Sequence, residues 1–211
     1  MVALFVLFLS LWSGNAEAAT RTVCSSSCSH TSIKAAYNAS SSTGDTIDVT
    51  DSRTYTEDFD ISKSITIGAS ATTPATWKGD TKNEIFKVKG GKTVVVEGFV
   101  FVPVARRAIQ VEAASTLTLR SIEIDGFSNT GQDGVGIKVN GGSTLTIEDS
   151  TFNNLVSKKG GVIDAQGNAV VTIDNCSFDG NEAGWWGGAV HAYESTVTIR
   201  DSSFVNHAAT W

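Results

Sequence analysis

The feature that most constrains this chain is a segment of about twelve residues that recurs four times in its second half. The copies are TLTLRSIEIDGF from Thr116, TLTIEDSTFNNL from Thr144, VVTIDNCSFDGN from Val170 and TVTIRDSSFVNH from Thr196. Within each copy apolar residues alternate with polar ones, which is the period of two expected of strands with one buried face. Aligning the copies puts like residues in columns, and one column has steps of 23, 28, 26 and 26 residues: Phe101, Ile124, Phe152, Phe178 and Phe204.

A second short apolar segment precedes each copy, and Gly, Asn and Asp corners separate the segments. These segments are IFKV, AIQV, GIKV, GVID and GAVH, which begin at residues 85, 108, 136, 161 and 188. A β-sandwich also has short alternating strands, but it does not predict that like residues recur in one column. Stacked coils do predict this, because each side chain lies on its counterpart one coil away at the ~4.8 Å strand spacing. The pattern therefore predicts an all-β parallel β-helix.

The N-terminal part predicts a cover for one end of this solenoid. The segment from Thr31 has the apolar spacing Ile33, Ala36 and Tyr37, which indicates a short amphipathic helix with Thr31 as its cap. The helix ends before Gly44, where a strand begins. A solenoid end needs a covering element, and this helix is suited to that role.

The first residues differ from the rest of the chain and predict export. An apolar run, ALFVLFLSLW, is followed by Ala16-Glu17-Ala18, which has the form of an A-x-A cleavage site, so we interpret residues 1–18 as a signal peptide. The alternative is an uncleaved membrane anchor, but a run of about ten apolar residues is short of the roughly 20 that a spanning helix needs. We therefore expect a secreted or cell-surface protein with no membrane span.

Export implies an oxidising compartment, where Cys24 and Cys28 of the N-terminal segment 19–30 are close enough to form a disulfide. A zinc site that also uses His30 is the alternative, although the spacing matches no strong zinc pattern and lacks a fourth ligand. Cys176 falls in an inward column, and we expect it to be a buried free thiol.

Two stretches resemble known families. TSIKAAYNASSSTGDTIDVTDSRTYTEDFDISKSITIGAS, from Thr31, resembles the opening coil of the pectin-lyase-like superfamily. That resemblance implies a single-stranded right-handed parallel β-helix with a short N-terminal capping helix, over residues 31–211. GGAV at Gly187 and FDGN at Phe178 are similar, in part, to the GGAI and FxxN repeats of polymorphic outer membrane proteins, which are surface adhesins. Such β-helices include polysaccharide lyases, glycosidases, epimerases and adhesive stalks, so the fold does not select a function.

An outward corner after the repeated strand is the candidate site for an enzyme. In lyases that resemble this fold, carboxylates on adjacent coils hold calcium, and the chain has candidates for such a set in Glu148, Asp149, Asp174 and Asp201. The alternative is a solvated turn with ordinary cross-strand ion pairs, since Arg120 and Arg200 share the same column. No segment resembles the catalytic motifs of pectate lyases or polygalacturonases.

Aromatic residues near another corner are the candidate site for binding. Trp185 and Trp186, with His191 and Tyr193 just beyond, offer flat faces of the kind that meet sugars or partner proteins. The alternative is that the two Trp rings fold back over a Gly-rich bend and cover the core. A third possibility is ice binding, because one outward column is rich in threonine: Thr66, Thr118, Thr146, Thr172 and Thr198.

Charge excludes one class of partner. The chain carries 16 Lys and Arg against 22 Asp and Glu, and this net charge of -6 gives no electrostatic footprint for nucleic acid. We therefore expect a secreted or cell-surface adhesion or binding protein for glycans or neighbouring surfaces, without a cofactor. A polysaccharide lyase, with calcium, is the alternative. Because the sequence ends at Trp211, before the next Gly-Gly strand is due, we also expect the β-helix to be truncated at its C-terminal end, as an N-terminal fragment of a longer protein.

Overall fold

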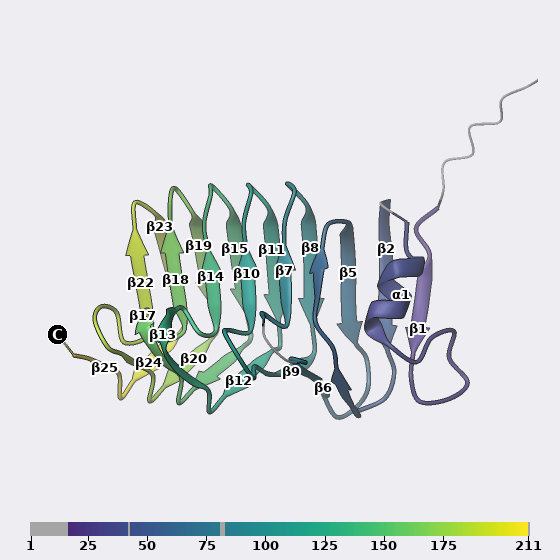
Figure 1. Ribbon diagram of the computed structural model, residues 1–211, viewed down its shortest axis with the longest axis horizontal. Coiled ribbons are helices and arrows are strands. Elements are labelled where there is room, and N and C mark those ends of the chain that lie inside the picture. Colours follow the sequence, from purple (N-terminus) through teal and green to yellow (C-terminus); the bar gives the residue numbers. More distant parts are fainter. Residues whose placement is uncertain (1–16, 42, 81–82, 211) are drawn as a thin grey trace, which may run out of the picture.

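The computed structural model describes residues 17–41, 43–80 and 83–210, which form a parallel β-helix of about seven turns with one short helix (Figure 1). The chain passes from one sheet to the next around each coil, so that every sheet consists of strands from successive coils. Paired strands within the named sheets are parallel throughout. The prediction of an all-β parallel β-helix is confirmed. The predicted signal peptide falls almost entirely on residues 1–16, outside the described residues.

Three long sheets run along the solenoid and a fourth is confined to the later coils. The eight-stranded sheet consists of β1 (Thr20–Val23), β2 (Thr43–Val49), β5 (Ser64–Ala69), β8 (Thr93–Glu97), β11 (Thr116–Arg120), β15 (Thr144–Glu148), β19 (Val170–Asp174) and β23 (Thr196–Arg200). The seven-stranded sheet consists of β3 (Thr54–Thr56), β6 (Ala75–Lys78), β9 (Phe99–Val102), β12 (Glu123–Asp125), β16 (Thr151–Asn153), β20 (Ser177–Asp179) and β24 (Ser203–Val205).

The six-stranded sheet closes each coil. It consists of β4 (Phe59–Ile61), β7 (Phe86–Val88), β10 (Ile109–Val111), β14 (Ile137–Val139), β18 (Ile163–Gln166) and β22 (Val190–Tyr193). The four-stranded sheet, which the sequence pattern did not predict, consists of β13 (Ser128–Asp133), β17 (Val156–Lys159), β21 (Glu182–Ala183) and β25 (Ala208–Ala209).

The columns read from the sequence are the registers of these sheets. Leu117 pairs with Val94 and Leu145, and Phe178 pairs with Phe152 and Phe204. The inward side chains of these strands are buried in one continuous hydrophobic core inside the solenoid. Cys176 is part of it, 3% exposed and free, as predicted, and burial raises the pKa of its thiol.

The corner between the eight-stranded and seven-stranded sheets is a single residue in the left-handed backbone region. Successive coils place Gly98, Ser121, Asp149, Asn175 and Asp201 there, all with positive φ. At Gly98 the nearest atom to an added Cβ is the carbonyl oxygen of Ala69, at 2.5 Å, so only glycine fits that coil. At three of the other four positions the residue is Asp or Asn, which tolerates this geometry better than most side chains.

The N-terminal end differs from the prediction in two details. Helix α1 (Ile33–Ala39) buries Ile33, Ala36 and Tyr37 as expected, but its N-cap is Ser32 and not Thr31, because the Ser32 hydroxyl accepts from the backbone N–H of Ala35. The segment 19–30 was expected to precede the solenoid. Instead its strand β1 pairs in register with β2 and is the first strand of the eight-stranded sheet.

Candidate functional site

The predicted carboxylate corner lies where the alignment put it, at the end of the eight-stranded sheet. Arg120 pairs in register with Glu97 and with Glu148. Its Nε lies 2.6 Å from a Glu148 carboxylate oxygen and its guanidinium 3.9 Å from Glu97. The hydrogen bond from Arg120 to Glu148 raises the pKa of Arg120. Since these side chains are about 40% exposed, the pairs contribute little stability.

The four residues of the candidate calcium set do not gather around a common point. Glu148 is paired with Arg120, and Asp149 accepts a hydrogen bond of 2.6 Å from the Asn175 amide. Asp174 pairs in register with Glu148 on one side and with Arg200 on the other, and Asp201 lies at the next corner. Within residues 17–41, 43–80 and 83–210, no group of three or more His, Cys, Asp or Glu side chains is arranged to hold a metal ion. Among the described residues, the ion pairs at this corner are those of Arg120 with Glu97 and Glu148.

The predicted aromatic residues come together more closely. Trp185 and Trp186 lie between β21 and β22, with side chains 48% and 42% exposed and ring centroids 5.7 Å apart, nearly perpendicular. His191 on β22 stacks against Trp186 at 5.8 Å. Tyr193, two residues further along the same strand, is 59% exposed. The two Trp rings are therefore not folded away over the core.

Two lysines from the neighbouring coil complete this surface, which we call the aromatic corner: Lys158, Lys159, Trp185, Trp186 and His191. The Lys158 ammonium lies 4.8 Å from the Trp185 ring centroid. The Lys159 ammonium lies 4.8 Å from the Trp186 centroid and 5.7 Å from that of Trp185. These are cation–π distances, so the ammonium groups are held over faces of the rings. The aromatic corner thus combines flat apolar faces with positive charge.

A buried carboxylate under the aromatic corner was missed by the sequence analysis. Asp164 on β18 is fully buried and pairs in register with Lys138 on one side and His191 on the other. Its carboxylate lies 2.7 Å from His191 Nδ1 and 3.4 Å from Lys138 Nζ. Gln166 donates to the same carboxylate. Asp164 therefore fixes the orientation of the imidazole that stacks on Trp186.

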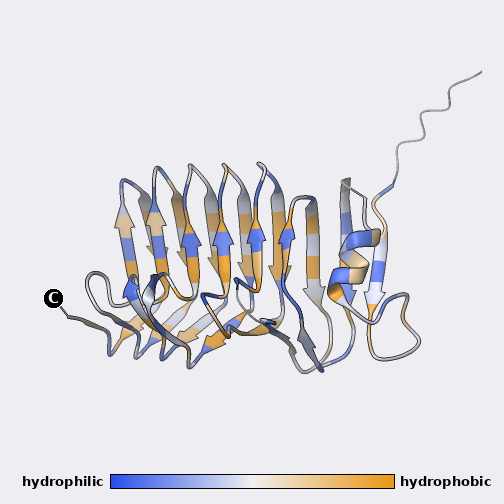
Figure 2. Cartoon of the chain, viewed as in Figure 1, coloured by the Kyte–Doolittle hydropathy of each residue, from blue (hydrophilic) through white to orange (hydrophobic). Residues whose placement is uncertain are grey.

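The signal for Asp164 was present in the same columns that gave the fold. Each strand of the six-stranded sheet has a polar residue at its outward middle position, visible as a recurring hydrophilic level from β7 to β22 (Figure 2). From one end of the sheet to the other these residues are Asp60, Lys87, Gln110, Lys138, Asp164 and His191. Extending the alignment to the segments IFKV, AIQV, GIKV, GVID and GAVH would have found all of them except Asp60, which precedes these segments.

The threonine column is also in register. Thr118, Thr146, Thr172 and Thr198 pair in succession on the outward face of the eight-stranded sheet, and Val95 stands between Thr66 and Thr118. This column is thus regular from β11 to β23 and interrupted at β8, and Val170 interrupts the neighbouring outward column at β19.

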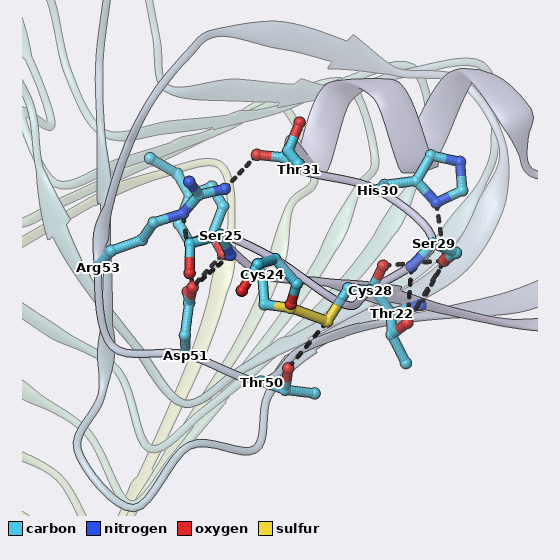
Figure 3. Close-up of a disulfide and its surroundings, with 12 residues drawn as sticks. Thr22, Cys24, Ser25, Cys28, Ser29, His30, Thr31, Thr50, Asp51 and Arg53 are labelled. Atoms are coloured by element: carbon cyan, nitrogen blue, oxygen red, sulfur yellow. Dashed lines mark hydrogen bonds and ion pairs between the residues drawn. A yellow bond between two sulfur atoms is a disulfide. The ribbon is translucent and has the colours of Figure 1, made fainter.

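The N-terminal end holds the predicted disulfide and a polar network around it. Cys24 and Cys28 are joined, and Figure 3 shows Asp51 and Arg53 beside them. Asp51 accepts a 2.7 Å bond from the backbone N–H of Ser25. Burial raises the pKa of Tyr55 to about 12, helped by its hydrogen bond to Asp51. These contacts attach the disulfide loop to the loop after β2, which is a structural role.

Comparison with known families supports the fold. Residues 107–210, about half of the chain, match the family described as "Right handed beta helix region". This part of the chain is a right-handed β-helix. The match is consistent with the pectin-lyase-like fold and gives no support to the resemblance to polymorphic outer membrane protein repeats. No curated protein and no solved structure matches the chain significantly. Within the described residues, no helix is both long enough and apolar enough to cross a membrane.

Proposed function

We propose that this protein is a secreted or cell-surface β-helix that binds glycans at the aromatic corner, without a cofactor. The observation that carries the proposal is the pair of exposed indole rings of Trp185 and Trp186, each with a lysine ammonium over one face. Exposed tryptophans are uncommon on a protein surface without a partner, and their rigid flat faces suit sugar rings. Adhesion to a glycan-coated surface follows from the same contact.

The charge of the aromatic corner selects the class of glycan. Lys158 and Lys159 add two positive charges next to the rings, on a chain whose net charge is -6. Two carboxylates lie on this side of the coil. Asp164 is already paired with Lys138 and His191, and Asp133, in register with Lys159, lies 3.5 Å from the Lys138 ammonium. The local excess of positive charge favours an acidic polysaccharide, whose carboxylates would approach the ammoniums while its sugar rings cover the indoles.

A binding measurement tests this proposal directly. Polygalacturonate is titrated against the wild-type protein and against the double variant Trp185→Ala/Trp186→Ala, and we expect at least a tenfold loss of affinity, or about 1.4 kcal/mol. Val104→Ala is the matched control, since Val104 is 39% exposed and lies away from the aromatic corner. Unchanged binding in the double variant, with the fold intact by circular dichroism, would contradict the proposal.

The lysines provide a second, independent comparison. Lys158→Gln/Lys159→Gln keeps both side chains polar and removes their charge, so we expect the preference for polygalacturonate over a neutral polysaccharide to fall and the salt dependence to weaken. Lys78→Gln, on the exposed end of β6, serves as the control. An equal loss of affinity for acidic and neutral glycans would show that the lysine charges do not select acidic glycans.

Two other activities are distinguished in the same preparation. A polysaccharide lyase would release unsaturated products that absorb in the ultraviolet from polygalacturonate, with or without calcium, and such products would make the protein an enzyme. An ice-binding protein would show thermal hysteresis, for which the in-register threonines from β11 to β23 are the relevant surface.

A further inference from the structure

His191 differs from the other groups of the aromatic corner because its charge can change. Histidine is the side chain whose charge ordinarily changes between about pH 5 and 8, whereas lysine stays cationic throughout that range. The His191 imidazole stacks on the Trp186 ring, with centroids 5.8 Å apart and planes 22° from parallel. The Lys159 ammonium lies 4.8 Å from the centroid of the same ring. A proton taken up by His191 would therefore add a second cation beside this indole.

The hydrogen bond to Asp164 determines which ring nitrogen takes up that proton. Asp164 is fully buried, and its carboxylate lies 2.7 Å from His191 Nδ1. An ionised carboxylate only accepts hydrogen bonds, so Nδ1 carries the hydrogen in the neutral ring and Nε2 holds the free lone pair. No hydrogen bond within the described residues occupies Nε2, the side chain is 14% exposed, and Nε2 is not sealed from solvent. Uptake of a proton at Nε2 thus breaks no contact of the folded protein.

The charged groups that neighbour His191 along the sheet include more carboxylates than ammoniums. Next to it, β18 contributes Asp164, and beyond that β14 contributes Lys138, whose ammonium lies 3.4 Å from the Asp164 carboxylate. Asp133 of β13 lies 3.5 Å from the same ammonium, and its other carboxylate oxygen is buried without a hydrogen-bond partner. Two carboxylates therefore share one ammonium. An imidazolium at His191 supplies a second positive charge to this group.

The remaining neighbours of the imidazole add one cation and no further carboxylate. From β17, Lys159 lies over the Trp186 ring on which His191 stacks. Gln166 of β18 donates to Asp164 and carries no charge. Lys138 and Lys159 repel an imidazolium, but Asp164 is the charged group that the imidazole contacts directly. An added proton thus meets a carboxylate that is already at hydrogen-bond distance.

We propose that His191 is the proton-controlled cation of the aromatic corner, so that this surface binds acidic glycans more tightly as the pH falls from about 8 to about 5. The inference rests on the proposed binding of acidic glycans at this corner. While His191 is neutral, glycan carboxylates meet the ammoniums of Lys158 and Lys159. Once it is protonated, Nε2–H is a third cationic donor beside Trp186, and charge-assisted hydrogen bonds to carboxylates are the strong ones.

Proton NMR of the free protein tests whether His191 changes charge. The chain has three histidines, so the resonance of the His191 Cε1 proton is assigned by its loss in His191→Gln. We expect this resonance to shift between about pH 8 and pH 5. A resonance that stays in place over this range would overturn the inference, whatever the protein binds.

Binding measurements test whether that charge controls the aromatic corner. Polygalacturonate is titrated against the wild type at pH 8 and pH 5, at one ionic strength, and we expect the affinity to be about threefold higher or more at pH 5. His191→Gln should lose this difference, because titration of the polysaccharide itself affects both proteins equally. His191→Lys carries a charge at both pH values and should bind more tightly than His191→Gln at pH 8. His30→Gln is the matched control, since His30 lies beside the N-terminal disulfide (Figure 3).

The outcomes separate this inference from the proposal on which it rests. If Trp185→Ala/Trp186→Ala loses affinity while His191→Gln keeps the pH dependence of the wild type, the aromatic corner binds glycans and the inference about His191 is wrong. Equal affinity of the wild type at pH 8 and pH 5 would overturn it as well. If polygalacturonate binds at neither pH, the proposed function is wrong, and its regulation by His191 is wrong with it.

Discussion

The first coils and the last coils contribute strands to the same sheets, but they differ in the number of residues per coil and in the packing of their aromatic side chains. In the eight-stranded sheet the register advances by 20 residues from Thr46 to Thr66 and by 29 from Ile65 to Val94, but by 26 at each of the last two steps. The early core is an irregular aromatic cluster: Tyr37, Phe59, Trp77, Phe86, Phe99 and Phe101. The late core contains an aromatic ladder: Phe152, Phe178 and Phe204.

The difference in aromatic packing determines how many coils each ring contacts. In the aromatic ladder each ring lies on its counterpart one coil away, 4.8 and 4.4 Å apart and within 16° of parallel. A contact of that kind joins neighbouring coils only, as in other solenoids. In the aromatic cluster, four rings from the three strands β4, β7 and β9 meet Trp77 at angles between 29° and 59°. The early coils are therefore joined into one packing unit, together with α1 through Tyr37, and the late coils are joined pair by pair.

The largest expected effect is that of removing Trp77. Its ring is fully buried and its indole N–H donates to the Glu57 carbonyl, so Trp77→Ala leaves a large cavity and an unpaired acceptor. We expect a loss of about 5 kcal/mol, with hydrogen-exchange protection lost over all the early coils. Phe178→Ala is expected to cost about 3 kcal/mol and to lower protection only in the coils that touch it. If both variants lost hydrogen-exchange protection over equally many coils, the early and late coils would not differ in how their packing is connected.

The next effect concerns a corner of the late coils. Gly160 and Gly142 both have positive φ, but a Cβ at Gly160 would lie 2.0 Å from the Ile163 carbonyl oxygen and one at Gly142 would meet nothing within 4 Å. Gly142→Ala should lower the free energy of unfolding by about 1 to 2 kcal/mol, because alanine is disfavoured in the left-handed backbone region. Gly160→Ala adds a clash with backbone of roughly 2 kcal/mol more. Thermal unfolding of both variants measures the difference, and similar melting temperatures would show that the corner relaxes.

A smaller effect is expected from the disulfide of the early coils. Because the loop from Cys24 to Cys28 is short, Cys24→Ser/Cys28→Ser should cost about 2 kcal/mol. The loss should be confined to β1 and the loop bearing Asp51 and Arg53, which the disulfide loop contacts (Figure 3). Hydrogen exchange by mass spectrometry locates it. A comparable loss of protection at β19 or β23 would mean that the early coils control the stability of the late ones.

The late coils could be predicted from the sequence almost completely, for the same reason that they are regular. A ladder repeats its residue types, so aligning Phe152 with Phe178 and Phe204 gives the register that the structure has. Cys176 was placed in the core by the same alignment, and it is there. The four-stranded sheet was missed because its strands are either polar, as in β13 and β17, or only two residues long, as in β21 and β25. In β13, SNTGQD, no buried residue marks the inward face.

The sites were harder to predict than the fold, because a site depends on what lies beside a residue and not on its column. Trp185 and Trp186 were recognised as candidates, but Lys158 and Lys159, one coil away, were not. The column position of Asp164 could have been predicted, since its column is as regular as any other. Its burial under His191 could not, because it depends on the packing of the next coil.

The smallest effect expected is a pH dependence of the early coils that comes from one buried carboxylate. Asp45 is buried and accepts from the backbone N–H groups of Ala19 and Ser41, which, with Arg21 at 2.7 Å, hold the pKa of its carboxyl below the ordinary value of 3.8. A carboxyl whose pKa is lower in the folded state stabilises that state above its unfolded pKa, and the contribution is lost as the pH falls through the folded one. Asp45→Asn should therefore cost about 1 kcal/mol at pH 7. Below pH 3.8 the variant and the wild type should converge, as melting temperatures across the range would show. A constant difference down to the lowest pH would mean that Asp45 acts through its shape and not its charge, and the two halves would then differ in packing alone.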